Sequence, residues 1–145
     1  MVRLEVKNIK NVEAALKKYG NKAVKEFADV VFDEATKLAE VAKIKAPVDF
    51  GTLQNSINWQ KVNDLDYNVG TKIPYAPFME FGTGGLVDIP SGWEGMAEPF
   101  KGKGIKQVNL TPQPFMYPAY LASKKTYSKQ LKLVIEKLNK DFNNG

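Results

Sequence analysis

The chain has 145 residues, of which 43% are hydrophobic and 26% charged, and it contains neither cysteine nor histidine. These proportions are typical of one soluble globular domain, and no apolar run approaches the ~20 residues of a membrane-spanning helix. The absence of cysteine excludes disulfides and thiolate chemistry. The absence of histidine removes the commonest general base near neutral pH and the commonest transition-metal ligand. The composition therefore excludes Cys/His zinc sites and makes an enzyme less expected.

The formal net charge is +5, and Arg3 is the only arginine among the 21 basic residues. Lysine attracts phosphate as a point charge, whereas arginine is the usual bidentate reader of guanine. The charge therefore argues against sequence-specific DNA recognition. Non-specific attraction to a nucleic-acid backbone stays an alternative.

The first half of the chain predicts one strand and two helices. Alternating aliphatic residues over 2–6 indicate a half-buried strand, and helical spacing indicates a short helix over about 12–19. The Gly-Asn pair at 20–21 is expected to break it. A long amphipathic helix follows over 22–46, ended by Pro47.

After this helix, "APVDFGTLQNSI" at 46–57 predicts a tight turn that leads directly into an alternating strand. A β-hairpin is expected to close at 63–66. Two prolines confine any strand at 75–81 to a sheet edge or an irregular path.

Residues 82–112 are rich in glycine and proline and predict a long irregular loop, with a weak hairpin signal at 106–110. A C-terminal helix beginning at Pro118 and lined with lysines follows through about 142. We treat residues 1–145 as one domain. Exposed aromatic side chains on an irregular loop are typical of anchors that become ordered on assembly, so the candidate interface residues are Trp93, Met96 and Phe100.

Two chemical alternatives are weak. "EFGTGG" and "KGKG" are glycine-rich and could form an anion-binding nest, but neither has the spacing of a P-loop. Asp49 and Glu80 could belong to a metal-dependent hydrolase, although nothing in the spacing of the carboxylates favours it. We predict no catalytic residue, no cofactor and no metal.

Three pieces in order, "APVDFGTLQNSI", "YAPFMEFGTG" and "PQPFMYPAY", resemble the small phage protein family named after gene product 10 of phage HK97. The resemblance covers about residues 1–142. Phe50 and Thr52 depart from the family pattern, and the interval between the second and third pieces is long. The positions that match the family pattern are Pro47, Gly51, Leu53, Ser56, Ile57, Tyr75, Ala76, Glu80, Phe81, Gly82, Thr83, Pro114, Phe115, Pro118 and Ala119.

The resemblance implies a structural, non-enzymatic protein of the head–tail junction that acts in tail completion. We expect an α+β domain in which a small, mostly antiparallel sheet packs against helix 22–46 and the C-terminal helix. The expected partners are other copies of the chain in a ring, which the resemblance implies to be sixfold, and other neck and tail proteins. Non-specific contact with passing DNA is also expected, and contact with a membrane is not. The expected location is the virion, after synthesis in the bacterial cytoplasm. The alternative function is a non-specific nucleic-acid-binding module that uses the lysine-rich C-terminal helix.

Overall fold

The computed structural model describes residues 2–5, 10–48, 51–82, 91–93, 95 and 110–144, and the account below concerns those residues. An antiparallel sheet and a set of helices packed beside it confirm the expected α+β class. No helix in these ranges has the length and apolar character needed to cross a membrane. In chain order the elements are β1 (Val2–Glu5), α1 (Lys10–Tyr19), α2 (Asn21–Lys45), α3 (Thr52–Ser56), β2 (Asn58–Asn63), β3 (Asp66–Gly70), α4 (Ala76–Phe81) and α6 (Met116–Asn143).

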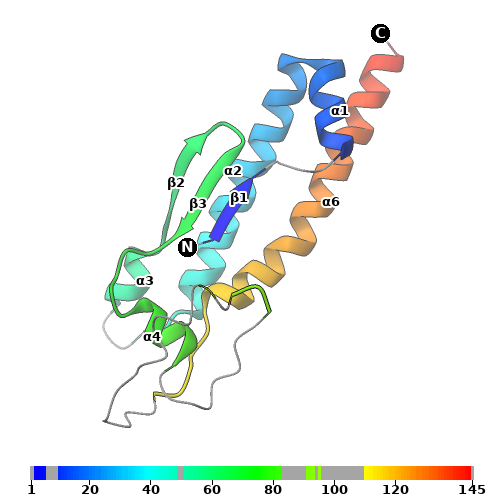
Figure 1. Cartoon of the computed structure of the whole chain (residues 1–145). Helices are drawn as coiled ribbons and strands as arrows, with labels where there is room; N and C mark the ends of the chain where they lie inside the picture. Colours follow the sequence, from blue (N-terminus) through cyan, green and yellow to red (C-terminus); the bar gives the residue numbers. More distant parts are fainter. Residues whose placement is uncertain are drawn as a thin grey trace.

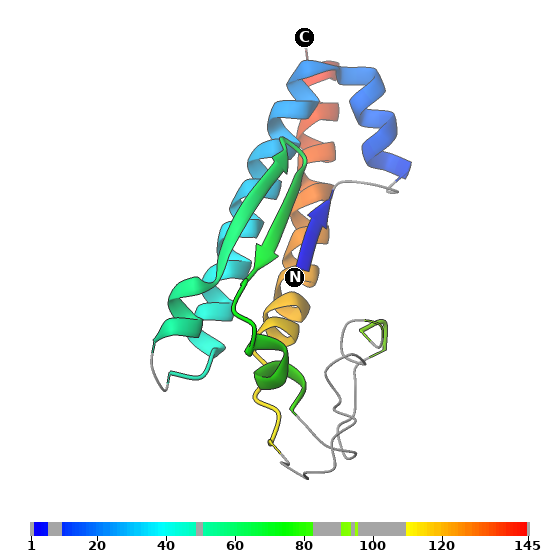
Figure 2. The same cartoon turned by 60° about the vertical axis from the view of Figure 1, so that its left-hand side comes forward.

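The long helix α2 lies in the middle of the molecule (Figures 1 and 2). On one side it packs against a three-stranded antiparallel sheet in the order β1-β3-β2, and on the other side against α6. Helix α1 lies beside the C-terminal end of α6, whereas α3 and α4 lie at the opposite end (Figure 1). The predicted small sheet packed against a long helix, with a C-terminal helix in the same body, is therefore confirmed.

Helix α2 forms where the predicted periodicity placed it. Phe27, Val31 and Leu38 are at most 1% exposed, and small alanines between them let the sheet and α6 approach closely. The helix begins after Gly20, whose φ of 57° and ψ of −133° break the path from α1 as expected. Burying each large side chain of this face contributes about 1.5 to 3 kcal/mol.

A buried carboxylate also joins α2 to α6. Glu34 is 1% exposed, and its Oε2 accepts hydrogen bonds from Ser123 Oγ at 3.4 Å and Thr126 Oγ1 at 3.3 Å. Its Oε1 lies 3.4 Å from Lys37 Nζ. The bonds to Ser123 and Thr126 fix the height of α2 relative to α6.

The hairpin of β2 and β3 confirms the predicted turn, but the strand does not begin where the sequence predicts. Thr52–Ser56 forms the short helix α3 instead of leading directly into a strand. Leu53 points into the core, and Ser56 Oγ donates back to the Leu53 carbonyl at 2.7 Å. A helix of fewer than two turns has no period to detect, which explains the error.

The segment 75–81 is also corrected. It forms helix α4 and not an edge strand. Pro77 is the second residue of this helix, where a backbone N–H would have no partner within the helix and its loss costs nothing. The same proline that argued against a central strand is therefore compatible with a helix start.

The aromatic face of the sheet is turned toward α2. The ring centroids of Phe32 and Trp59 are 5.3 Å apart, and those of Trp59 and Tyr67 are 5.6 Å apart, both with edge-to-face geometry. Such pairs contribute about 0.5 to 1.5 kcal/mol beyond their buried area.

The single arginine fastens β1 to β3. Arg3 Nε donates to Asp66 Oδ1 at 2.9 Å, and the guanidinium also contacts Oδ2.

Because Asp66 is buried and the Arg3 side chain is 52% exposed, we expect Arg3→Ala to lower the free energy of unfolding by about 1 to 2 kcal/mol. Urea unfolding checks this. The free energy of unfolding of Arg3→Lys should lie between those of the wild type and Arg3→Ala, because lysine keeps the positive charge but not the two parallel N–H donors of arginine. Equal stability of all three proteins would contradict the assigned role of this ion pair.

Candidate functional site

The family-pattern residues of the second and third motifs meet at a joint between α4 and the start of α6. Glu80, in α4, is 6% exposed. Its Oε2 accepts hydrogen bonds from the backbone N–H groups of Phe115 at 2.9 Å and Met116 at 2.8 Å. Its Oε1 accepts the N–H of Tyr117 at 2.8 Å. The carboxylate therefore caps a helix that begins 36 residues further along the chain.

Glu80 and Pro118 together account for all the unpaired donors at this helix start. An α-helix leaves four N–H groups without partners inside the helix, from the N-cap through the third residue. Phe115, the N-cap, makes no side-chain capping bond, and Glu80 takes its N–H and the next two. The fourth position is Pro118, which has no N–H. Pro118 thus lies within the first turn, whereas the sequence predicts that it begins the helix.

Gly82 lets two backbone segments approach closely beside this cap. Its φ is +69°, and a Cβ at this position would lie 2.5 Å from the Leu110 carbonyl oxygen and 2.9 Å from the ring of Pro112. Just before it, the Met79 carbonyl accepts a hydrogen bond from Gln113 N–H at 2.7 Å. A side chain at 82 would push apart the segments that bring Phe115 to Glu80.

Aromatic side chains cover the joint. Phe115 is 2% exposed and belongs to the hydrophobic core. Trp93 is half-buried, with its ring centroid 5.1 Å from Tyr117, 6.0 Å from Tyr120 and 6.2 Å from Phe81. The sequence predicts Trp93 as a contact residue for a partner. In the structure, part of its ring surface packs against aromatic residues of its own chain. Met96, Phe100 and Thr83 lie outside the described residues.

The first motif has a separate structural role at the end of α2. Gly51 has a φ of 67°, Ile57 is fully buried, and Gln54 Nε2 donates to the Lys43 carbonyl at 3.0 Å. Ser56 Oγ lies 2.6 Å from Thr71 Oγ1, which ties α3 to the end of β3. This motif reverses the chain from helix to sheet.

The remaining family-pattern residues flank these two places. Ala76 and Ala119 are at most 5% exposed, whereas Tyr75 is 44% exposed at the start of α4. Pro47 is half-buried after α2, and Pro114 is exposed before Phe115.

No arrangement for metal chemistry is found in the parts of the chain that the structure describes, where no three acidic side chains lie close enough to hold an ion. Asp49 lies outside these parts. Both Glu80 oxygens are used by backbone N–H groups. Glu80 therefore acts as a structural acceptor in this fold.

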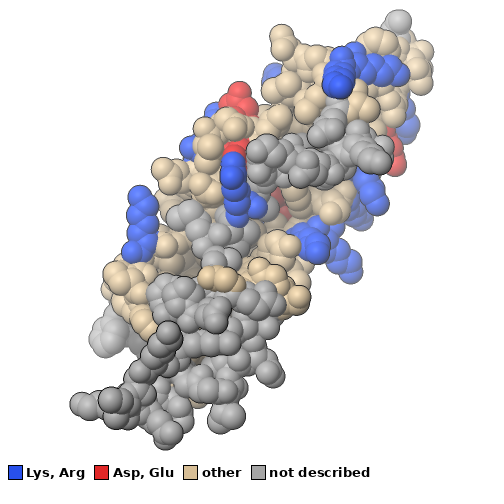
Figure 3. Space-filling model, viewed as in Figure 1, with Lys and Arg blue, Asp and Glu red and all other residues tan. Residues whose placement is uncertain are grey.

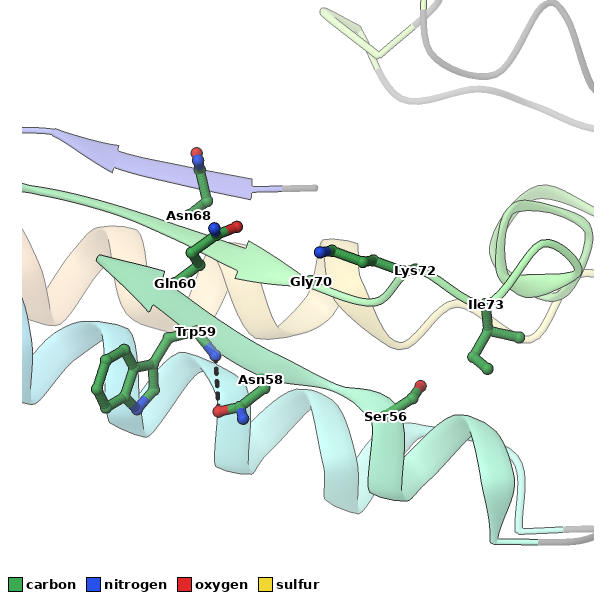
Figure 4. Close-up of a pocket in the computed structure, with 8 residues that line it drawn as sticks. All are labelled: Ser56, Asn58, Trp59, Gln60, Asn68, Gly70, Lys72 and Ile73. Carbon is green, nitrogen blue, oxygen red and sulfur yellow. Dashed lines mark hydrogen bonds between the residues drawn. The ribbon is translucent and has the colours of Figure 1, made fainter. Parts of the chain in front are cut away.

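Two pockets lie side by side at the end of the sheet, where β3 leads into α4. The first, of about 470 Å³, is lined by Ile73, Pro77, Phe81 and Trp93, among others. The second, of about 340 Å³, has amide side chains from the hairpin, and Figure 4 shows Gln60 and Asn68 on the opposite side of the hairpin from Trp59. Both pockets include Lys72, an exposed cation. The larger pocket is lined mainly by apolar side chains, together with Lys72 and Glu80.

Lysines on α6 dominate the charge at one side of the molecule (Figure 3). Lys137 Nζ pairs with Glu26 at 2.9 Å, and this hydrogen bond raises the pKa of Lys137. At the end of α6, Lys22 pairs with Asp141 at 3.2 Å. The other lysines of α6 form no ion pair within the described ranges; they are Lys124, Lys125, Lys129, Lys132 and Lys140.

At the joint and at the end of α2, the family-pattern residues hold elements of the fold together. The sequence profile of the HK97 gp10-like family, described as "Bacteriophage HK97-gp10, putative tail-component", matches residues 7–82. Because the match covers more than half of the chain, this protein belongs to that family. It is a phage tail-related structural component, and its place is the virion. No curated protein and no solved structure matches the chain.

Proposed function

We propose that this protein is a ring-forming subunit of the head–tail junction that completes the tail and joins it to the head. The observation that carries the proposal is the family membership together with the use of the family-pattern residues. Glu80, Gly82 and Phe115 make a fixed joint, in which both Glu80 oxygens accept backbone N–H groups. A rigid joint beside an open apolar pocket supports a role in assembly.

Contacts between copies need surfaces that a neighbour can cover. The pocket lined by Pro77, Phe81 and Trp93 supplies one such surface. Ile44 and Val48, at the end of α2, are 78% and 68% exposed and supply apolar side chains of the size that such a pocket accepts. A contact between two different patches on identical chains closes into a ring when the rotation between neighbours allows it.

The decisive experiment uses a phage lysate in which the gene for this protein is disrupted. We expect DNA-filled heads and tails to accumulate separately, and the purified protein to restore infectious particles when it is added to the mixture. Light scattering and negative-stain imaging of the protein, alone and bound to purified tails, should show a ring. Normal joining without the protein would contradict the proposal.

The second candidate is a non-specific nucleic-acid-binding module. The observation that favours it is the group of α6 lysines that form no described ion pair. Binding to a random DNA duplex should then weaken steeply as salt rises, with a slope that reports the number of phosphates contacted. Affinity that is weak and independent of α6 substitutions would dismiss this candidate.

A further inference from the structure

Two stripes of exposed charged side chains run along the two long helices. The α2 stripe consists of Lys25, Asp29 and Asp33, which are spaced by four residues and therefore lie on successive turns. Within the described residues none of the three forms an ion pair. The order of charge along the stripe is one positive and then two negative groups.

The α6 stripe consists of Lys125, Lys129, Lys132 and Glu136, all of them exposed. Spacings of four, three and four residues keep these side chains on one face of the helix. In the part of the chain that the structure covers, they too have no ion-pair partner. Read from the C-terminal end, the stripe is one negative and then three positive groups.

Contacts inside the molecule show that the two stripes lie at the same height. Helices α2 and α6 run in opposite directions (Figure 1). Lys25 is next to Glu26, which pairs with Lys137, so Lys25 lies near the height of Glu136.

At the other end of the α2 stripe, Asp33 is next to Glu34, which contacts Ser123 and Thr126. Asp33 therefore lies near the height of Lys125 and Lys129. Asp29 lies between these two levels, and it is also close enough to Lys137 of its own chain for the two charges to attract each other.

We propose that the α2 stripe of one copy of this chain contacts the α6 stripe of a second copy. Rotation about an axis parallel to the helices leaves the height of every residue unchanged. In a ring with such an axis in which these two faces meet, Lys25 of one copy lies at the height of Glu136 of the next, while Asp29 and Asp33 lie at the heights of lysines. Each charge faces its opposite without any shift along the helices.

The presence of both signs in each stripe favours a protein partner over DNA. A duplex presents uniform negative charge, for which an unbroken row of lysines would be sufficient. Glu136 would repel a phosphate, but it lies where Lys25 of a neighbouring copy would be. This contact rests on the proposed function, because it identifies one surface through which neighbouring copies of the ring would touch.

Exposed ion pairs contribute little affinity, whereas opposed like charges are strongly disfavoured. The stripes therefore act mainly by fixing register between copies, and the apolar contacts supply most of the affinity. Association should weaken as salt rises, because the Debye length falls to about 8 Å at physiological ionic strength and shortens further above it.

Charge reversal tests the contact. We expect Asp29→Lys/Asp33→Lys and Lys129→Glu/Lys132→Glu each to lower the self-association constant about tenfold or more in sedimentation velocity experiments at low salt. An equimolar mixture of the two variants should associate, because each supplies the charge that the other needs. The matched control combines all four reversals in one chain, which keeps the net charge of the wild type and should restore self-association.

Three results would overturn the contact. Both double variants could self-associate like the wild type, their mixture could fail to associate, or the wild type could stay monomeric at millimolar concentration.

A different result would assign the stripes to DNA instead: affinity for a DNA duplex that is lowered by Lys129→Glu/Lys132→Glu and raised by Asp29→Lys/Asp33→Lys. The joining experiment separates this failure from that of the ring. Variants that associate and join heads to tails normally refute only the stripe contact, whereas a wild-type protein that does not restore joining refutes the proposed function.

Discussion

Replacing Glu80 with alanine is expected to lower the free energy of unfolding by about 3 to 5 kcal/mol, since three backbone N–H groups at the start of α6 lose a charged acceptor in a largely buried place. Urea unfolding followed by circular dichroism measures this loss. Glu80→Gln should cost less, because the amide keeps one of the two oxygens. Its NH2 group, however, would face an N–H that needs an acceptor.

Glu40→Ala is the matched control for this prediction. Glu40 is an exposed residue of α2, and we expect its replacement to change stability by no more than about 0.5 kcal/mol. A Glu80→Ala protein as stable as this control would show that water replaces the carboxylate at the helix start. The remote cap would then have no part in the stability of the fold.

Gly82→Ala is expected to destabilise the protein by about 4 kcal/mol, which combines the strain of a positive φ with a methyl group forced against backbone. The added Cβ would lie 2.5 Å from the Leu110 carbonyl oxygen, which cannot move aside as a flexible side chain could. Thermal or urea unfolding measures the loss.

Gly20→Ala separates the two causes. Gly20 also has a positive φ, of 57°, but a Cβ there would have no neighbour within 4 Å. We expect this substitution to cost about 1 to 2 kcal/mol, from strain alone. Equal losses for the two glycines would mean that the close approach of residues 82 and 110 does not matter.

The long elements could be predicted from the sequence because their periods extend over many turns. The apolar spacing of Phe27, Val31 and Leu38 places α2 to within one residue of its observed bounds. Leu131, Val134 and Leu138 do nearly the same for α6. The turn residues predict the hairpin, and the three ordered motifs are sufficient to indicate the family.

The joint could not be predicted, because its parts are distant in sequence and carry no local signal. Nothing near Glu80 shows that its carboxylate receives N–H groups from residues 115–117. Pro77 is readily interpreted as a limit on a strand, although its missing N–H also suits the start of a helix. The buried Glu34 and the Arg3–Asp66 pair likewise escape prediction, since a charged residue in a helix or strand is usually exposed.

The joint also makes residues 83–109 a natural place for insertion. Both ends of this interval are held together by the 2.7 Å bond between Gln113 N–H and the Met79 carbonyl and by the close approach of Gly82 to Leu110. Because the free-energy cost of connecting two fixed points rises by only about 0.6 kcal/mol for each doubling of a flexible insertion, the spacing of α4 and α6 should tolerate added residues between them. A peptide tag or a small domain placed within this interval, away from the Trp93 that packs against Phe81 and Tyr117, should therefore leave the two-helix scaffold intact.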